Sequence, residues 1–188
     1  MTARKLVCPW WLCFTFDNPL RKLLHNPKAI LGPHIQPGND VIDVGAGMGY
    51  FSIPMAKLVG PKGHVTAVDI QAKMLSALVR RAQRRGVSER ITTHLASPGS
   101  LVHHLQADFI LAFWMVHEVP DQKRLLKEIH NLLKPDGLFL LVEPIVHVSK
   151  KSFLQTLKTA EDVGFFIKES PRIRISRSAL LGVSKNNL

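Results

Sequence analysis

The sequence is short of acidic residues: its 188 residues include 14 Asp and Glu against 25 Lys and Arg, a formal net charge of +11. This imbalance indicates an anionic partner, and nucleic acid, an acidic membrane surface and an anionic substrate all satisfy it. The sequence also lacks Ser- or Gly-rich linkers and internal repeats. With 46% hydrophobic and 21% charged residues, it is expected to fold as about one ordered domain with a proper core.

Cysteine is scarce as well. Cys8 and Cys13 are too few to complete a four-ligand zinc site, and we expect two reduced thiols rather than a disulfide or a metal clip. The adjacent His103 and His104 have no third ligand at a suitable spacing. We therefore expect these histidines at the surface and predict no metal cofactor.

Long apolar runs are missing. The longest near the start, residues 7–16, contains Pro9 and is too short to span a bilayer, so no transmembrane helix is predicted. Arg4 and Lys5 before it imitate a signal peptide, but no small-residue cleavage site follows. The expected location is the cytoplasm, with a peripheral membrane contact as an alternative.

The chain is organised around a glycine-rich stretch. Residues 41–44 are predicted to form a buried strand, and Gly45, Gly47 and Gly49 follow at every second position before a segment with helical spacing. Glycine permits a positive φ and lets a ligand lie directly against the peptide groups. The N–H groups at the start of the following helix favour a carboxylate or another polar ligand group.

An acidic residue on the next strand narrows the kind of ligand. Asp69 ends the predicted strand 64–69, the placement at which an α/β nucleotide site accepts hydrogen bonds from ribose hydroxyls. Dinucleotide sites use G-x-G-x-x-G, whereas this chain has G-x-G-x-G preceded by Asp43. A carboxylate beside the turn would repel a pyrophosphate and favours an ammonium group.

These motifs resemble those of the class I S-adenosylmethionine-dependent methyltransferases, from about Pro37 to Pro144. The resemblance implies an α/β, Rossmann-like doubly wound fold with a mostly parallel seven-stranded sheet and a C-terminal antiparallel hairpin. It implies a methyltransferase with S-adenosylmethionine as cofactor and S-adenosylhomocysteine as product. Residues 1–36 are then expected to form a helical and aromatic lid, and residues 37–188 the cofactor-binding domain.

The remaining elements follow from spacing and turn residues. Helices are predicted at 50–58, 71–85, 121–133 and 150–163, with one or two short helices in 18–31 interrupted at Asn26-Pro27. Met74, Leu75, Leu78, Val79 and Ala82 form the expected buried stripe of the second of these helices. Further strands are predicted at 91–95, 108–114 and 138–142, a turn at 134–137, and hairpin strands at 165–168 and 172–180.

The cofactor assignment combines these placements with the resemblance. Asp43 and the glycine backbone are expected to hold the methionine end and Asp69 the ribose. Many relatives place an acidic residue after the third strand to bond adenine, where this chain has Ser97, whose hydroxyl or backbone is the expected substitute. Ile70 is expected to border the adenine. The predicted cofactor-binding residues are Asp43, Gly45, Ala46, Gly47, Gly49, Asp69, Ile70, Ser97, Ala112 and Phe113.

The methyl acceptor is expected to dock after the fourth strand, at residues 115–121. This segment resembles small-molecule methyltransferases, including those of ubiquinone and menaquinone biosynthesis, which often carry histidine at the position of His117. It lacks the Asn/Asp-Pro-Pro-aromatic motif of many nucleic-acid amino-methyltransferases. A small or lipid-like acceptor with an O, C or S nucleophile is therefore favoured over RNA. A noncatalytic binding module is the contrasting hypothesis.

His117 is the candidate general base, because imidazole titrates near neutrality, and Glu118 is a candidate to orient it or contact the acceptor. The alternative is that both residues only brace the following segment. Trp10, Trp11 and Trp114 are the predicted substrate-binding aromatics. For Trp10 and Trp11, packing on the core and a place at a membrane interface remain alternatives.

Overall fold

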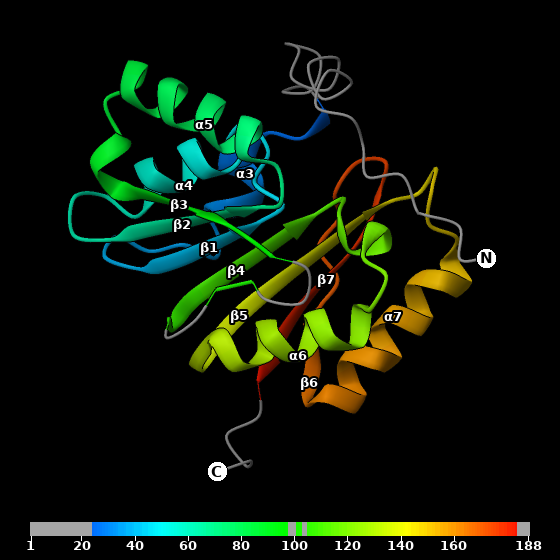
Figure 1. The fold of residues 1–188 in the computed structure, drawn as a ribbon. Helices are drawn as coiled ribbons and strands as arrows, with labels where there is room; N and C mark the ends of the chain where they lie inside the picture. The colour runs from blue at the N-terminus through cyan, green and yellow to red at the C-terminus, as the bar shows by residue number, and fades with distance from the viewer. Residues whose placement is uncertain (1–23, 98–100, 103–104, 184–188) are drawn as a thin grey trace.

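Seven strands form one mixed sheet (Figure 1). The glycine turn and the segment that contains His117 both follow the carboxyl ends of its parallel strands. The computed structural model describes residues 24–97, 101–102 and 105–183. The strands are β1 (Asp40–Val44), β2 (His64–Asp69), β3 (Ile91–Leu95), β4 (Ala107–Phe113), β5 (Leu133–Pro144), β6 (Phe165–Glu169) and β7 (Ser176–Val183). Their order is β3-β2-β1-β4-β5-β7-β6. The first five are parallel, and β7 is antiparallel to β5 and β6, which confirms the predicted fold class.

Helices cover both faces of the sheet (Figure 1). On one face lie α3 (Pro27–Leu31), α4 (Ser52–Leu58) and α5 (Ala72–Arg84), and on the other α6 (Gln122–Leu132) and α7 (Lys150–Val163). Two short 3-10 turns, η1 (Ser88–Arg90) and η2 (Val116–Glu118), complete the elements. Side-chain caps fix where α6 and α7 begin: Asp121 accepts from the N–H of Arg124, and Ser149 from that of Ser152.

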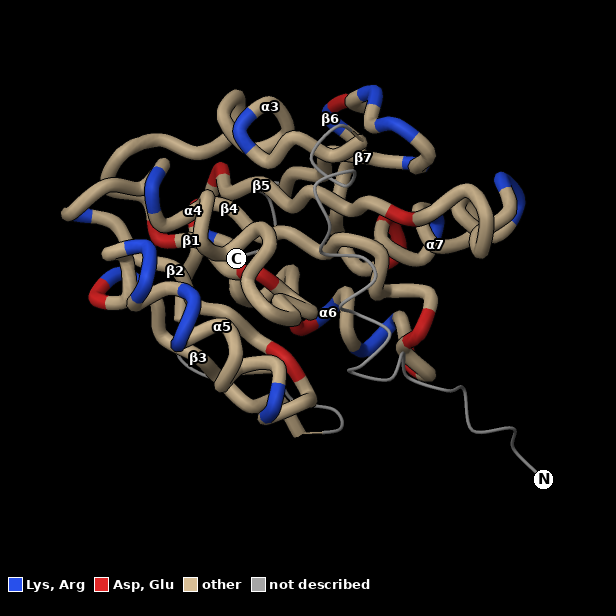
Figure 2. Tube along the Cα trace, turned by 90° about the horizontal axis from the view of Figure 1, so that it is seen from above, with Lys and Arg blue, Asp and Glu red and all other residues tan. Residues whose placement is uncertain are grey.

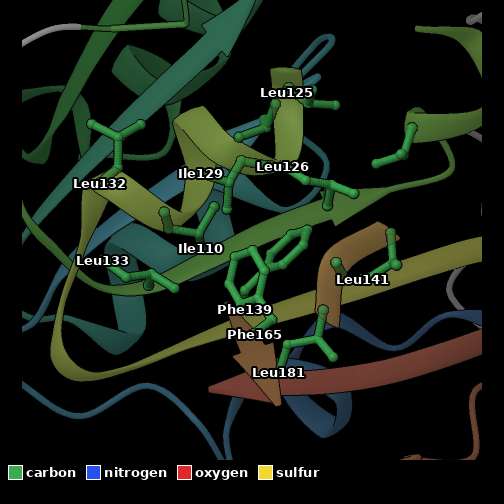
Figure 3. Packing of buried hydrophobic residues seen from close by; sticks show 14 of the residues in the cluster. Ile110, Leu125, Leu126, Ile129, Leu132, Leu133, Phe139, Leu141, Phe165 and Leu181 are labelled. Atoms are coloured by element: carbon green, nitrogen blue, oxygen red, sulfur yellow. The ribbon is translucent and has the colours of Figure 1, made fainter. Parts of the chain in front are cut away.

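The core consists of two layers, one on each face of the sheet. Side chains alternate along β5, so Phe139 and Leu141 pack against α6 and α7, whereas Leu140 and Val142 face the layer that contains α4 and α5. Figure 3 shows Phe139 among Leu126 and Ile129 of α6 and residues of the neighbouring strands. This burial on both faces holds the carboxyl ends of β1, β4 and β5 in fixed positions.

Backbone conformation explains where the observed boundaries differ from the predicted ones. Helix α4, predicted at 50–58, begins at Ser52 rather than residue 50. Positive φ values at Gly47 and Gly49 keep the preceding turn out of the helical region. Trp114, predicted in β4, leaves the strand with φ 59°. Ile175 has φ 48°, and β7 begins only after it, at Ser176 rather than residue 172.

The segment 134–137 does end α6, but it continues into β5 instead of forming a separate turn. Lys134 donates through Nζ to the carboxylates of Asp40 and Asp108, both at 2.9 Å, and so ties the start of β5 to those of β1 and β4. Asp136 has φ 68°, and the β4–β5 register shifts nearby. The strand therefore absorbs the predicted break as an irregularity.

Helix α5 confirms four of the five residues of the predicted stripe. Met74, Leu75, Leu78 and Ala82 are buried, but Val79 is 37% exposed at the border of the apolar face.

The N-terminal prediction is only partly covered by the structure. Leu24 is helical, His25 and Asn26 are not, and α3 begins at Pro27, which confirms the expected interruption at Asn26-Pro27. Asn26 caps α3 by accepting from the N–H of Lys28 at 3.0 Å. Leu31 and Ile35 are buried against the core. The tryptophans at 10 and 11, both cysteines and the paired histidines at 103 and 104 lie outside the described residues. Within the described ranges, no helix is long and apolar enough to cross a membrane.

Candidate active site

The glycine turn lies at the carboxyl end of β1 and is held against the end of β2. The N–H groups of Gly45 and Ala46 donate to the carbonyl of Val68 at 2.8 and 3.0 Å. Gly45, Gly47 and Gly49 have φ values of 75°, 54° and 81°, a region that L side chains rarely adopt. The glycines are therefore required by the backbone of the turn itself.

The three glycines differ in what surrounds them. A Cβ on Gly45 would lie 3.0 Å from Cγ of Met115, and one on Gly49 would lie 2.8 Å from Cγ of Leu78. A Cβ on Gly47 would meet no atom within 4 Å. Gly45 and Gly49 thus permit close packing, whereas the face of Gly47 is open for a ligand to approach the backbone.

Asp69 faces the glycine turn, as predicted. Its Oδ2 accepts from the N–H of Gly47 and its Oδ1 from the N–H of Gln71, both at 2.8 Å. Burial raises the pKa of Asp69 above 3.8, while backbone hydrogen bonds from Gln71, Gly47 and Ile70 act in the opposite direction. Each carboxylate oxygen can accept more than one hydrogen bond, so the group is still able to accept from hydroxyls of a ligand.

Asp43 lies behind the turn. It is 2% exposed and accepts a hydrogen bond of 2.5 Å from Oγ of Ser52, the first residue of α4. This contact joins the end of β1 to the helix that follows the turn. The predicted interaction with an ammonium group stays a prediction, and the contact seen here is with the protein.

Two residues expected near the adenine lie exposed after adjacent strands. Ile70 follows β2 and is 55% exposed, and Ser97 lies two residues beyond the end of β3. Asp69 and Leu95 pair in the β2–β3 register, and the N–H of Ala96 donates to the carbonyl of Asp69 at 2.9 Å. Ile70 and Ser97 therefore lie at the carboxyl ends of the neighbouring strands β2 and β3. Ala46 is buried within the turn.

Ala112 and Phe113, which are predicted to lie beside the methionine portion of the cofactor, are buried at the end of β4. Ala112 is fully buried, and the ring of Phe113 packs on Phe51 with 4.4 Å between centroids. The indole of Trp114 packs edge-on against buried His25 at 4.8 Å, and its Nε1 donates to Oγ of Ser176 at 3.0 Å. The visible contacts of Trp114 are internal, and its substrate contact remains a prediction.

His117 is held by Glu143, at the end of β5. The backbone N–H of His117 donates to Oε1 of Glu143 at 2.8 Å, and Nδ1 lies 2.6 Å from Oε2. The side chain of Glu143 is 2% exposed and that of His117 is 21% exposed. A carboxylate oxygen accepts hydrogen bonds, so this contact suits the imidazole tautomer that carries its proton on Nδ1 and its lone pair on Nε2. Glu143 thus makes an orienting contact with His117, and the role of Glu118 stays a prediction.

Three residues of the site are not singled out by the sequence analysis. Glu143 has a weak signal, an acidic residue at the end of an otherwise apolar strand. His147, whose ring lies 5.9 Å from that of His117, has none. Met115, which packs at Gly45, is covered only as part of the expected docking segment 115–121. These contacts join segments far apart in the chain, so only the fold brings them together.

The family model described as a methyltransferase domain matches residues 35–173. The chain belongs to this methyltransferase family. The chain is 28% identical over 128 residues to the demethylmenaquinone methyltransferase of Lactobacillus johnsonii, covering 64% of this chain and 52% of the relative. It is 30% identical over 113 residues to the arsenite methyltransferase of Halobacterium salinarum, covering 60% of this chain and 28% of the relative.

A solved SAM-dependent methyltransferase from Aquifex aeolicus shares the fold of this chain with a TM-score of 0.85 at 20% identity. The match covers 95% of this chain and all of that one. The class I resemblance is therefore confirmed at the level of the fold. The chain spans about half the length of the demethylmenaquinone methyltransferases it matches.

The described residues of the chain fit a nucleoside cofactor at the glycine turn. The open face of Gly47 allows close approach to the backbone, and the Asp69 carboxylate beside it suits ribose hydroxyls. Exposed Ile70 offers an apolar surface for a base. Among these residues, no group of three or more His, Cys, Asp or Glu side chains could hold a metal ion.

Proposed function

We propose that the chain transfers a methyl group from S-adenosylmethionine to a small or lipid-like acceptor with an oxygen, carbon or sulfur nucleophile. The observation that carries the proposal is that the glycine turn and the His117–Glu143 pair lie at one edge of the sheet. Met115 packs at Gly45, and His117 follows two residues later. A candidate cofactor cradle and a candidate base are therefore neighbours.

The proposed cofactor contacts follow the order of the strands. Asp69 would hold the ribose hydroxyls, Ile70 and Ser97 the adenine, and the backbone at Gly45, Ala46, Gly47 and Gly49 the methionine end. Asp43 would support that end from behind the turn, with Ala112 and Phe113 beside it. The fit of Gly47 and Asp69 supports this arrangement.

The bound cofactor supplies an activated methyl group on a sulfonium, so the main task of the protein is to align the acceptor and exclude water. Positioning of this kind contributes roughly 7–11 kcal/mol to lowering a barrier. In our proposal, Nε2 of His117 takes the proton that the nucleophile loses, and Glu143 stabilises the imidazolium through Nδ1–H. Glu143 is then a positioning residue, because it acts through His117.

The relatives support a small-molecule acceptor, since two of them are named for demethylmenaquinone and arsenite. The missing Asn/Asp-Pro-Pro-aromatic motif after β4 argues against amino-methylation of nucleic acid. The exposed apolar residues Ile145, Val146 and Ile175, which follow β5 and precede β7, favour an acceptor with lipid character.

The test is calorimetry with S-adenosylmethionine and S-adenosylhomocysteine, followed by a labelled-methyl screen over quinols, phenols, thiols, arsenite and RNA. On the best acceptor, His117→Ala should lower kcat by roughly 10²–10⁴-fold, the usual contribution of a general base. Affinity for S-adenosylhomocysteine should be unchanged, because His117 is not assigned to the cofactor.

Each outcome has a distinct meaning. Unchanged turnover in His117→Ala would reject the base role but keep the methyltransferase. Tight cofactor binding without transfer to any acceptor would favour a noncatalytic module. Transfer to RNA alone would overturn the small-molecule proposal, and absence of cofactor binding would overturn the function as a whole.

A further inference from the structure

A second exposed surface lies beside the candidate site, where the β5–α7 loop meets the loop that precedes β7. The N–H of Ile145 donates to the carbonyl of Ile175 at 3.1 Å, so the two loops lie side by side. Glu143, which holds His117, pairs with Arg177 in the adjoining β5–β7 register. The surface therefore adjoins the expected acceptor side.

This surface presents aliphatic side chains to solvent. Val146 is 81% exposed, and Ile145 and Ile175 are 43% and 40% exposed. The N–H groups of His147 and Val148 donate to the carbonyl of Pro144 at 3.3 and 2.9 Å, which fixes the tight turn that carries Val146. An ordered turn thus holds an apolar side chain away from the core.

The same surface is strongly basic. Lys150 and Lys151 begin α7, Arg174 precedes Ile175, and all three are exposed. Residues 145–160 and 170–183 contain no Asp or Glu, and no ion pair joins these three cations to a carboxylate of the described chain. Figure 2 shows Lys and Arg at one end of α7 and along the β6–β7 hairpin, which also carries Glu169 at the end of β6. The local charge is therefore positive and not offset by acidic neighbours in these segments.

We propose that Ile145, Val146 and Ile175, rimmed by Lys150, Lys151 and Arg174, form a docking edge for an anionic lipid membrane. Aliphatic side chains can enter the interface, while lysine and arginine meet the lipid phosphates. The charge complementarity alone would also suit nucleic acid. The exposed aliphatic group on an ordered turn favours lipid, because phosphate contacts call for polar and cationic groups.

Docking would bring the His117 side of the sheet close to the bilayer surface. A lipid-like acceptor could then reach the site from the membrane, a consequence that rests on the proposed function. Binding to the membrane itself does not depend on methyl transfer, so the two proposals fail separately.

The test is co-sedimentation of the full chain with vesicles of phosphatidylcholine alone or mixed with phosphatidylglycerol, at low and high salt. We expect binding to the mixed vesicles only, weakened by salt. Lys150→Gln/Lys151→Gln should weaken it roughly 25-fold, about fivefold for each lysine. Val146→Ser should weaken it about fivefold through lost apolar contact.

Matched variants separate the docking edge from total charge. Lys57→Gln/Lys62→Gln removes two exposed lysines at α4 and the turn after it, and Val79→Ser changes an exposed valine on α5. Both should bind like the parent protein. Equal losses in the two double variants, or no vesicle binding at low salt, would overturn the proposal. The proposal would also be overturned by the pattern expected of an RNA site. In that pattern, Lys150→Gln/Lys151→Gln abolishes binding of single-stranded RNA, and Val146→Ser changes neither RNA binding nor vesicle binding.

Discussion

At the scale of single residues, two carboxylates near the candidate site carry different tasks because they lie in different surroundings. Glu143 is buried against His117, whereas Asp69 is partly buried and bonded to backbone N–H groups of the glycine turn. The first can act only through the imidazole it holds. The second borders the open face of Gly47, where a ligand can reach it.

Glu143→Gln should lower kcat on the identified acceptor by on the order of 10²-fold, with a smaller change in KM, because an amide stabilises an imidazolium less than a carboxylate does. Stopped assays over a range of pH provide the measurement. Titration of a base should appear as an acid limb in the profile of the parent protein and be missing in His117→Gln. A loss of kcat matched by an equal loss of folded protein would instead assign Glu143 a structural role.

Affinity for S-adenosylhomocysteine should fall as pH decreases through the pKa of Asp69, which burial raises above 3.8. The ionised group is the better acceptor for ribose hydroxyls, and a charged hydrogen bond contributes roughly 1.5–3 kcal/mol. Asp69→Asn should bind about 10- to 100-fold more weakly at neutral pH and lose this pH dependence. Calorimetry measures both, with circular dichroism to confirm folding at each pH.

The same shift has the opposite sign for stability. Because its pKa is raised in the folded state, Asp69 binds its proton more tightly there than in the unfolded chain. Its contribution to the free energy of unfolding therefore decreases as pH rises from about 3.8 through the raised value.

The affinity measurement has its own contrary outcome. If affinity for S-adenosylhomocysteine were flat across this pH range, Asp69 would not be the ribose ligand.

At the scale of elements, the glycine turn combines a packing role with a binding role. Gly49 lets α5 approach through Leu78, and Gly45 admits Met115 from the segment after β4. A Cβ on Gly47 would meet neither Leu78 nor Met115. The turn thus fixes the position of two neighbouring elements while leaving one peptide face accessible.

Gly47→Ala and Gly49→Ala should separate these roles. Gly47→Ala should cost about 1 kcal/mol of unfolding free energy for its positive φ, and weaken S-adenosylhomocysteine binding at least tenfold, because the methyl group would occupy the open face. Gly49→Ala should cost roughly 2–4 kcal/mol, since overpacking against buried Leu78 adds to the same backbone term. Urea unfolding and calorimetry measure the two effects.

Gly60→Ala is the matched control. Gly60 has φ 67° and no atom within 4 Å of an added Cβ, but it lies in the turn before β2, at the opposite end of the strand from Asp69. It should show the backbone cost without the loss of affinity. Equal affinities in the Gly47 and Gly60 variants would argue against a ligand at the glycine turn.

At the scale of the whole molecule, S-adenosylhomocysteine should stabilise the fold, because a ligand that binds only the folded state shifts the unfolding equilibrium. At 100 times Kd the gain is about 2.7 kcal/mol, which for a chain of this size raises Tm by roughly 5–10 °C. Differential scanning calorimetry at increasing ligand concentration measures it. Adenosine diphosphate serves as the control and should give no comparable shift, since the turn is not expected to favour a pyrophosphate.

The sequence by itself determined the succession of elements and the placement of Asp69 beside the glycine turn. Regular apolar spacing places β2 at 64–69, β3 at 91–95 and α7 at 150–163, and Asp69 is placed beside the turn by its position at a strand end. These are local features, since each depends on a few consecutive residues or on neighbouring parallel strands. The resemblance to class I methyltransferases supplied the mostly parallel seven-stranded sheet and its C-terminal antiparallel hairpin, which local patterns leave open; the order of the strands came from the structure.

Tertiary structure alone decided the surroundings of His117 and of Gly45. Glu143 contacts His117, and Met115 meets Gly45, because the ends of β4 and β5 converge with the glycine turn. It also set Lys134 between Asp40 and Asp108, so that a predicted turn became part of a strand. Contacts between segments that are distant in sequence depend on packing over the whole sheet, and no local spacing encodes them.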